Sequence, residues 1–375
     1  MRVLLTGAAG FIGGAVARVL MERGHDVVGV DAYIPQAHGD SAPAGHSEGR
    51  AGLQDRGTSG VDVRHVDVRD ATTVHEALTG VDVVCHQAAV VGAGVTPADL
   101  PLYASHNDLG TAVLLAEMSA RGIDRLVLAS SMVVYGDGRY RCALHGDQLP
   151  PPRLQAHLTS GRFDVDCPLC GQDMQWELVD EDAPLRPRSS YAASKVAQEH
   201  YASAWARQLP AATVALRYHN VYGPGMPRDT PYSGVAAIFR SSVERGEAPR
   251  VFEDGRQMRD FVHVDDVAMA NALAVETVAR MDDDSFAAYN VCSGRPVSIA
   301  DVARAVANGS AAARQAGSAL EPVTTGEFRP GDVRHIVASP RRAAQELGFT
   351  AVVEPETGLA QFATAPLRAA AITSR

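Results

Sequence analysis

The 375-residue sequence lacks several features that mark specialised classes of protein. Its five cysteines are odd in number and too few for a disulfide scaffold. It contains no run of about eighteen apolar residues, so we predict no transmembrane helix and no membrane partner. Glycines break the N-terminal apolar run too early for a signal peptide. We therefore expect a soluble, cytoplasmic protein.

An excess of basic residues is also missing. Lys and Arg number 34 against 44 Asp and Glu, so the formal net charge is −10. A chain this acidic does not attract nucleic acid polymers by bulk charge, and we expect no nucleic acid partner. A phosphorylated ligand would need backbone N–H groups and a few placed arginines. Hydrophobic residues make up 46% of the chain, which is enough for a large core.

The first half of the chain alternates short apolar runs with helical patterns. Helical spacing of apolar residues predicts a helix over Phe11 to Arg23, ending at Gly24. The predicted strands are Arg2–Thr6, Asp26–Val30, Val61–Val66, Val81–Cys85, Arg125–Ala129 and Thr213–Leu216. Such alternation indicates parallel strands joined by crossover helices, so the predicted fold is α/β, with a Rossmann-type doubly wound sheet.

The predicted domain organisation follows changes in composition. Residues 1–220 form the sheet domain, and residues 221–375 form mainly a smaller C-terminal substrate lobe, with some segments returning to the first domain. Two stretches interrupt the pattern. Pro35 to Gly60 is rich in glycine and is predicted to be a surface loop. Residues 137–176 are rich in Pro, Gly, Arg and Cys and form a second insertion.

A glycine-rich turn lies between the first predicted strand and the first helix. Gly7, Gly10 and Gly13 occur there with Phe11 and Ile12, in the order that lets a backbone approach a pyrophosphate at a helix N-terminus. Alone, such a triplet is compatible with an ordinary tight turn. Asp31 ends the second strand, where a carboxylate would bind ribose hydroxyls and repel a 2′-phosphate. The pattern therefore predicts NAD as cofactor. The alternative is that Asp31 is an ordinary solvated residue at the end of a strand.

Tyr191 and Lys195 are four residues apart, which places a phenol and an ammonium on one helical face. A phenol with a pKa of about 10 needs nearby positive charge to act as a base at neutral pH. Alone, the pair is compatible with an ordinary surface helix. Ser131 follows another predicted strand, at the sheet edge where doubly wound folds bind ligands, and could hydrogen-bond the oxygen that Tyr191 deprotonates.

Five segments, in this order, carry a family resemblance: TGAAGFIGG, HQAA at 86–89, SSMVVYG, YAASK and LRYHNVYGPG at 216–225. Together they resemble the extended short-chain dehydrogenase/reductase family, and within it most closely the nucleotide-sugar epimerases and dehydratases. The resemblance runs from Met1 to about Arg334, with the two insertions outside it. It implies a nucleotide-diphosphate sugar as substrate and a homodimer formed by the helices around 107–118 and 191–208.

The resemblance also implies residue roles. Tyr191 would be the general base, Lys195 would hold the nicotinamide ribose, and Ser131 would support the sugar oxygen. The implied cofactor contacts beyond the glycine turn are Asp67, Val68, Ala88, Ala89 and Asn107. Asn220, Arg259 and Arg329 would bind the substrate, the two arginines at its diphosphate, although either arginine could instead form a surface salt bridge.

One departure from the family pattern narrows the reaction. Dehydratases of this family place an acidic pair after the hydroxyl residue, whereas this chain has Met132 and Val133 there. Dehydration is therefore disfavoured, and oxidation of a sugar hydroxyl followed by hydride return to the opposite face, a 4-epimerisation, is the prediction. A 4-keto-sugar-nucleotide reductase using NAD(P)H and a non-catalytic dinucleotide sensor remain the alternatives.

The second insertion contains Cys142 and His145, then Cys167 and Cys170, each pair separated by two residues. Two such pairs suit a tetrahedral, structural zinc site in a zinc-ribbon-like lobe. The alternative is that the four residues are reduced and lie in a surface loop without a metal. We expect this lobe to lie over the sugar pocket. The cysteine pattern also resembles that of dTDP-L-rhamnose 4-epimerase-like bacterial proteins, which implies a dTDP-6-deoxyhexose such as dTDP-L-rhamnose as substrate. Cys85 and Cys292 are predicted to be buried thiols.

Overall fold

The computed structural model describes residues 1–34, 38, 55–56, 60–92, 96–228, 234–310, 313 and 320–368. The predicted loop from Pro35 to Gly60 therefore lies almost entirely outside the described residues. Within the described part of the chain, no helix is long and apolar enough to cross a membrane.

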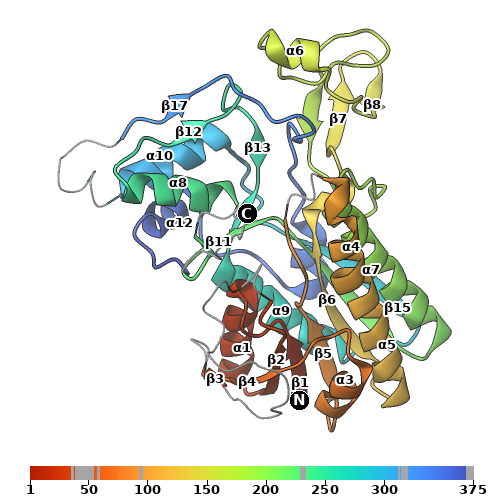
Figure 1. The fold of residues 1–375 in the computed structure, drawn as a ribbon. Helices are drawn as coiled ribbons and strands as arrows, with labels where there is room; N and C mark the ends of the chain where they lie inside the picture. The colour runs from red at the N-terminus through yellow and green to blue at the C-terminus, as the bar shows by residue number, and fades with distance from the viewer. Residues whose placement is uncertain are drawn as a thin grey trace.

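A twisted sheet with the strand order β15-β10-β6-β5-β1-β2-β4-β3 forms the centre of the molecule (Figure 1). Seven strands are parallel, and β3 pairs antiparallel with β4 at one edge. This order confirms the predicted doubly wound fold. The strands are β1 (Arg2–Thr6), β2 (Asp26–Asp31), β3 (Asp55–Arg56), β4 (Asp62–His65), β5 (Val83–His86), β6 (Arg125–Ser131), β10 (Ala212–Tyr218) and β15 (Ser285–Val291).

Helices cover both faces of the sheet because its strands are apolar on both sides. In β1, Val3 and Leu5 face the layer formed by α1 and α9, whereas Leu4 faces the layer of α3, α5 and α7. Cys85 and Cys292 are buried, as predicted. The helices of the two layers are α1 (Phe11–Glu22), α3 (Ala71–Ala77), α4 (Leu100–Tyr103), η3 (Ala104–Leu109), α5 (Gly110–Ala120), α7 (Ser190–Gln208), α9 (Val264–Val278) and η5 (Ala343–Leu347).

The strand order reverses between β1 and β5, and this reversal locates the site. On either side of such a point the crossover helices lie on opposite faces, so the carboxyl ends of the two strands open into a crevice. A Cβ atom built on Gly7, directly after β1, would lie 2.9 Å from the backbone nitrogen of Ala88, which follows β5. The two loops therefore meet closely at the floor of this crevice.

A smaller lobe with its own apolar core stands beside the carboxyl edge of the sheet (Figure 1). Phe239, Phe261 and Phe362 form its centre with Tyr222. The chain between its elements returns to the sheet domain, since α9 packs against α1 and β15 pairs with β10. The lobe contains β11 (Asn220–Tyr222), α8 (Val235–Glu244), β12 (Arg250–Val251), β13 (Met258–Arg259), β14 (Phe261–His263), β16 (Val297–Ser298), α10 (Ile299–Gly309), β17 (Val323–Thr324) and α12 (Pro355–Phe362).

The second insertion forms a separate small unit that projects beside the lobe (yellow-green in Figure 1). It has a three-stranded antiparallel sheet in the order β8-β7-β9 and a short helix. Its apolar core consists of Tyr140, Cys142, Val165, Cys167 and Met174. The elements are β7 (Arg139–Cys142), β8 (Gly146–Gln148), α6 (Gln155–Thr159) and β9 (Gln175–Glu177). Two short 3₁₀ helices, η2 (Pro97–Asp99) and η4 (Met132–Tyr135), lie in the sheet domain.

Candidate active site

The glycine turn joins β1 to α1 in a space that side chains would fill. Gly7 has a φ of +69°, and a Cβ on Gly13 would lie only 2.0 Å from the carbonyl oxygen of Gly7. No side chain caps the start of α1 at Gly10, so the first N–H groups of the helix remain available to an anion. The turn therefore has the geometry of a cradle for a pyrophosphate.

Asp31 lies at the end of β2 beside this turn and is 7% exposed. One carboxylate oxygen accepts a hydrogen bond from the Ala9 N–H at 3.1 Å, and the other accepts one from the Tyr33 N–H at 2.8 Å. The His38 ring nitrogen Nε2 lies 3.1 Å from the second oxygen. The carboxylate is thus held at the edge where the predicted ribose contact requires it.

Three cavities adjoin one another along the carboxyl edge of the sheet. A cavity of about 110 Å³ is lined by Asp31, Asp67, Val68, Ala88 and Ala89, among others. It shares Gly7, Gly10, Gln87 and Ala89 with a cavity of about 330 Å³ that also contacts Phe11, Ile12, Gly13, Tyr191 and Lys195. That cavity shares Asn220 and Val235 with a third, of about 770 Å³, in the C-terminal lobe. Shared lining residues thus connect the three cavities, from Asp31 at one end to the C-terminal lobe at the other.

Ser131, Tyr191 and Lys195 meet beside the middle cavity. Ser131 ends β6, and its hydroxyl lies close enough to the Tyr191 phenol to act on the pKa of that phenol. The Lys195 ammonium lies 6.0 Å from the centre of the Tyr191 ring and donates a hydrogen bond to the Ala129 carbonyl at 2.9 Å. The structure thus brings a strand-end hydroxyl to a helical pair that comes much later in the chain.

Burial controls the protonation of this trio. Desolvation raises the pKa of the Tyr191 phenol, and the hydrogen bond from Ser131 opposes that shift. Desolvation also lowers the pKa of Lys195 to about 7, against the opposing charges of Glu199 and Asp108. The phenol is therefore poised to ionise only when further positive charge is near.

Asn220 begins β11 at the junction of the middle cavity with the lobe cavity. Its side-chain amide donates to the Asp260 carbonyl at 3.0 Å and lies 3.7 Å from the Met132 sulfur. Met132 and Val133, which replace the acidic pair of the dehydratases, start η4 directly after Ser131. This position next to Ser131 therefore carries a thioether and a methyl-bearing side chain instead of two carboxyl groups.

Arg259 and Arg329 both line the lobe cavity. The Arg259 guanidinium donates to the Met258, Val333 and Arg334 carbonyls at 2.9, 2.5 and 3.0 Å. The Arg329 guanidinium is 5.1 Å from the centre of the Phe252 ring. In the described part of the chain neither forms an ion pair with a carboxylate, so a surface salt bridge does not account for them, and both offer positive charge to the cavity.

Asn107, predicted as a cofactor contact, lies beneath the cavity lining, and its role toward the cofactor stays a prediction. It is fully buried, its amide oxygen accepts from the Val90 N–H at 2.8 Å, and its amide nitrogen donates to the Val90 carbonyl and the Ser194 hydroxyl at 3.0 and 2.9 Å. Its hydrogen-bonding groups are therefore occupied, and none of the three cavities includes it. Asn107 positions Val90, which lines the smallest cavity, and ties it to α7.

Comparisons with known proteins agree with this geometry. The family model described as the NAD dependent epimerase/dehydratase family matches residues 3–153 and 170–292. The chain belongs to this family. It is 32% identical to the dTDP-L-rhamnose 4-epimerase of Burkholderia thailandensis, covering 97% of this chain and 94% of the relative. It is 29% identical to the UDP-glucose 4-epimerase of Mycolicibacterium smegmatis, with 96% of each chain covered.

Solved structures of epimerases share the whole fold. The UDP-glucose 4-epimerase of Thermus thermophilus, in complex with NAD, superposes with a TM-score of 0.69 at 30% identity over 97% of this chain and 98% of that chain. The UDP-glucose 4-epimerase of Thermotoga maritima, with UDP-glucose, has a TM-score of 0.71 at 26% identity and covers 97% of each chain. The family assignment therefore holds for fold as well as for sequence.

This epimerase/dehydratase family member holds its tyrosine helix through a buried ion pair that the sequence analysis missed. Glu199, two turns after Tyr191 on α7, pairs with Arg217 of β10 at 2.7 Å and accepts a hydrogen bond from Ser130. Arg217 also donates to the Tyr135 hydroxyl at 2.9 Å. The spacing of Tyr191, Lys195 and Glu199 places them on one helical face, but only the fold supplies the partners of Glu199.

Arg368 is a second residue that the sequence analysis missed. Its guanidinium donates to the Ala9 carbonyl in the glycine turn at 2.7 Å and lines the middle cavity. The backbone of the same residue bonds Met226 and Arg228, which carries the C-terminal segment across the cofactor crevice. No motif surrounds this arginine, so no sequence signal links it to a turn 359 residues away.

The four predicted metal ligands converge in the second insertion. The ligand atoms of Cys142, His145, Cys167 and Cys170 all lie within 4.8 Å of one another. The sulfurs of Cys142 and Cys170 are 3.7 Å apart, and His145 Nδ1 is 3.6 Å from the sulfurs of Cys142 and Cys167. Tetrahedral zinc with bonds of about 2.0–2.3 Å requires separations of roughly 3.6–3.8 Å. These three separations fit zinc, and the cluster as a whole is compact enough to surround one ion.

The insertion itself does not lie where the sequence analysis placed it. None of the described residues 137–176 lines the middle cavity or the lobe cavity. Instead, the insertion packs against the backbone of residues 332–335, where the His335 N–H donates to the Tyr140 hydroxyl at 3.1 Å and the Arg153 guanidinium donates to the Asp332 carbonyl at 2.5 Å. The expectation of a lobe over the sugar pocket is wrong, because polar contacts to the C-terminal lobe hold the unit to one side.

Proposed function

We propose that the protein is an NAD-dependent nucleotide-sugar 4-epimerase that acts through a transient 4-keto sugar. The observation that carries this proposal is the place of Tyr191 and Lys195 in the lining of the middle cavity, with Ser131 beside the phenol, between a glycine-turn cradle and an arginine-lined lobe cavity. The cofactor would be held by residues that line the two smaller cavities: Gly7, Gly10, Phe11, Ile12, Gly13, Asp31, Asp67, Val68, Ala88 and Ala89.

Arg368 adds a positive charge to this cofactor site. In the described structure its guanidinium has one hydrogen-bond partner, the Ala9 carbonyl, and no carboxylate within ion-pair distance. It lies near the N-terminal end of α1, where the helix dipole already disfavours a cation. An anion in the cradle would relieve both the desolvation of Arg368, which lowers its pKa, and this repulsion. We assign Arg368 to the pyrophosphate of the dinucleotide.

The chemistry of the sugar falls to Tyr191 and Ser131. The 4-hydroxyl of the substrate would bind between the two side chains, where Ser131 holds the oxygen and the phenolate of Tyr191 takes its proton. When bound, NAD would supply the hydride acceptor and, in its oxidised form, a positive charge near the phenol. Lys195, fixed by the Ala129 carbonyl, would hold the ribose and stabilise the phenolate. Tyr191 returns the proton when the keto sugar is reduced on its other face.

The nucleoside diphosphate would lie in the lobe cavity, with Asn220 at the sugar end and Arg259 and Arg329 at the diphosphate. We propose a dTDP-6-deoxyhexose such as dTDP-L-rhamnose as the substrate. The supporting observation is that the relative of Burkholderia thailandensis at 32% identity is named dTDP-L-rhamnose 4-epimerase.

Zinc in the second insertion is part of the proposal. Four protein ligands would fill a tetrahedral shell, so the ion would be structural. Hydrogen bonds from the Leu144 and His145 N–H groups lower the pKa of Cys142 to about 6, which favours the thiolate that zinc binds.

A homodimer through α5 and α7 is also proposed from the family resemblance, and light scattering of the purified protein tests it.

A sugar-nucleotide panel incubated without added cofactor tests the function. The epimerase is expected to convert one nucleotide sugar to its 4-epimer, seen by chromatography, while keeping its NAD. Stoichiometric consumption of added NAD(P)H would identify a 4-keto-sugar reductase instead. Absence of turnover for all dTDP and UDP sugars, with NAD still bound, would favour a dinucleotide sensor and contradict the proposal.

A further inference from the structure

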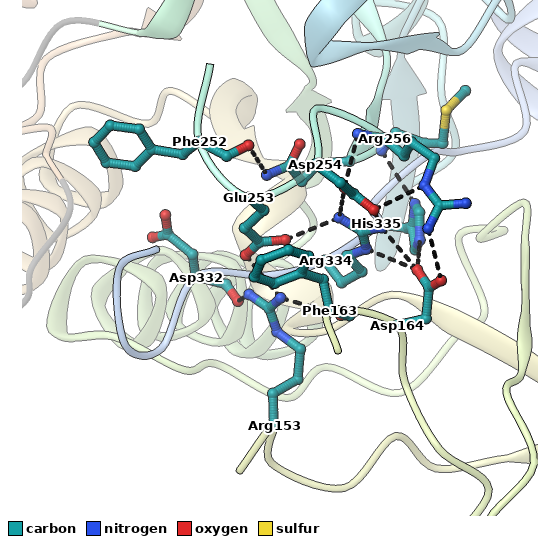
Figure 2. A network of polar contacts seen from close by, with 12 residues as sticks. Arg153, Phe163, Asp164, Phe252, Glu253, Asp254, Arg256, Asp332, Arg334 and His335 are labelled. Carbon is teal, nitrogen blue, oxygen red and sulfur yellow. Dashed lines mark hydrogen bonds and ion pairs between the residues drawn. The ribbon is translucent and has the colours of Figure 1, made fainter. Parts of the chain in front are cut away.

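The contact between the second insertion and the C-terminal lobe centres on one buried arginine (Figure 2). The Arg334 side chain is 0% exposed. It lies 2.9 Å from Glu253 and 2.7 Å from Asp254 of the lobe, and 2.8 Å from Asp164 of the insertion. We call these residues, together with Arg153, the Arg334 cluster. One guanidinium thus joins carboxylates from two units that are separated by about 90 residues in the chain.

Arg153 makes a second connection from the insertion. Its guanidinium bonds Glu253, itself 3% exposed, at 2.7 Å and the Asp332 carbonyl at 2.5 Å. Figure 2 shows Arg153 and Asp164 approaching Arg334 from the insertion side, with the lobe carboxylates opposite. The insertion therefore contributes one cation and one anion to the cluster, and loss of either removes an ion pair to a buried partner, Glu253 or Arg334.

Paired charges and an aromatic ring define the geometry of this contact. Although burial alone would raise it, the hydrogen bond from Arg334 holds the pKa of Asp254 at about 2. Phe163 of the insertion covers the guanidinium, with the Arg334 Cζ atom 5.9 Å from its ring centre. Paired ions under an aromatic cover bind in one geometry, because any shift breaks several charge-assisted hydrogen bonds at once.

The same stretch of backbone forms one wall of the lobe cavity. Asp332 and Val333 line that cavity together with Glu253 and Arg259. The Arg259 guanidinium donates to the carbonyls of Val333 and Arg334. Residues 332–335 are thus held from outside by the insertion and in turn hold Arg259 on the inside. Arg329 lies only three residues before this stretch.

We propose that the insertion positions the two arginines of the substrate site through the Arg334 cluster, so that it sets the affinity for the nucleoside diphosphate and leaves the chemical step unaffected. The inference rests on the proposed function for its substrate class. Arg153, Asp164 and Arg334 are positioning residues, since they contact the wall of the cavity and not its contents.

Asp164→Asn tests the proposal in the full-length protein. It is expected to raise KM for the nucleotide sugar, and Kd for the free nucleoside diphosphate, by about tenfold, with kcat within about twofold and NAD content unchanged. Arg153→Gln is expected to act in the same direction. Asp164→Glu should recover part of the affinity, because it restores the charge.

Asp166→Asn is the matched control. Among the described residues, Asp166 pairs with Arg162 at 2.9 Å and with His157 at 3.3 Å, both within the insertion. The KM and Kd of the Asp166→Asn protein should therefore match those of the wild type. Calorimetry with UDP and dTDP gives Kd without any turnover, and a thermal melt establishes that each variant is folded.

Folded Asp164→Asn protein with unchanged KM and Kd would overturn the proposal, as would a loss confined to kcat. If the wild type binds UDP or dTDP but converts no sugar, the proposed function fails while the Kd comparison still decides the inference. If Arg153→Gln alone folds, its Kd decides in the same way.

Discussion

The cofactor side and the substrate side of this protein are built on different principles. On the cofactor side, Gly7, Gly10 and Gly13 lie within seven residues, and Asp31 follows in the next strand. On the proposed substrate side, Asn220, Arg259 and Arg329 come from separate segments, and the insertion of residues 137–176 holds one wall. A site made by one turn tolerates changes elsewhere, whereas a site made by distant contacts depends on each of them.

The largest expected effect lies where the two sides meet. Tyr191→Phe removes the proposed base and is expected to lower turnover about 10²- to 10⁴-fold, since a positioned general base contributes that much. NAD content should stay unchanged, because the phenol oxygen is not part of the glycine cradle. The measurement is kcat with the best nucleotide sugar, together with the NAD released on denaturation.

Tyr201→Phe serves as the control for that experiment. Tyr201 is on the same helix and is 46% exposed, so the same chemical change there should leave turnover intact. Wild-type turnover by the Tyr191→Phe protein would show that Tyr191 is not the base, and the two sides would then not meet at this residue.

Loss of zinc tests the substrate side alone. Cys142→Ser is expected to reduce bound zinc from about one ion per chain to none and to lower the melting temperature of the insertion, because metal binding and folding are coupled in such small units. NAD content should not change. Elemental analysis measures the zinc content, and calorimetry measures the melting temperature. Cys292→Ser is the control, because Cys292 is a buried thiol outside the insertion. Equal zinc in Cys142→Ser and the wild type would contradict the site.

Arg368 tests whether the cofactor side is as local as its motif. Arg368→Gln is expected to weaken NAD binding about tenfold or more, since a hydrogen bond to a charged group contributes about 1.5–3 kcal/mol. Arg228→Gln is the matched control, because Arg228 lies on the same C-terminal contact but pairs with Glu244 at 2.8 Å. Unchanged NAD affinity in Arg368→Gln, measured by fluorescence titration, would restrict the site to the glycine turn.

Asp31 carries the smallest expected effect. Asp31→Asn keeps an oxygen that can accept from the Ala9 N–H, but it removes the charge that repels a 2′-phosphate. The preference for NAD over NADP should fall by a few-fold to about tenfold. Titrations with both dinucleotides measure it, and Asp26→Asn, at the exposed opposite end of β2, is the control. An unchanged ratio would assign Asp31 to the support of the neighbouring backbone at Ala9 and Tyr33.

The sequence predicted those parts of the fold that depend on local pattern. The predicted helix from Phe11 to Arg23 is α1, and all six predicted strands are present, most of them one or two residues longer or shorter. The bounds of β15 (Ser285–Val291) were not predicted from the sequence. Its place beside β10 depends on a return of the chain that no local spacing encodes.

The site was predicted in the same uneven way. Tyr191 and Lys195 follow from helical spacing, and the zinc ligands follow from two paired spacings. The cofactor role of Asn107 stays a prediction, and the structure adds that its amide bonds Val90 and Ser194. Where an amide or guanidinium points depends on partners that the fold brings from elsewhere, and a single sequence does not reveal them.

The sequence by itself determined the glycine turn, the spacing of Tyr191 and Lys195, and the two metal-ligand pairs, because each depends on backbone geometry within a few residues. Only the tertiary structure decided that Arg368 reaches the turn at Ala9, that Glu199 pairs with Arg217, and that the insertion packs on residues 332–335 instead of over the sugar pocket. These contacts join distant segments, and a buried charge accepts whichever partner the fold brings within reach.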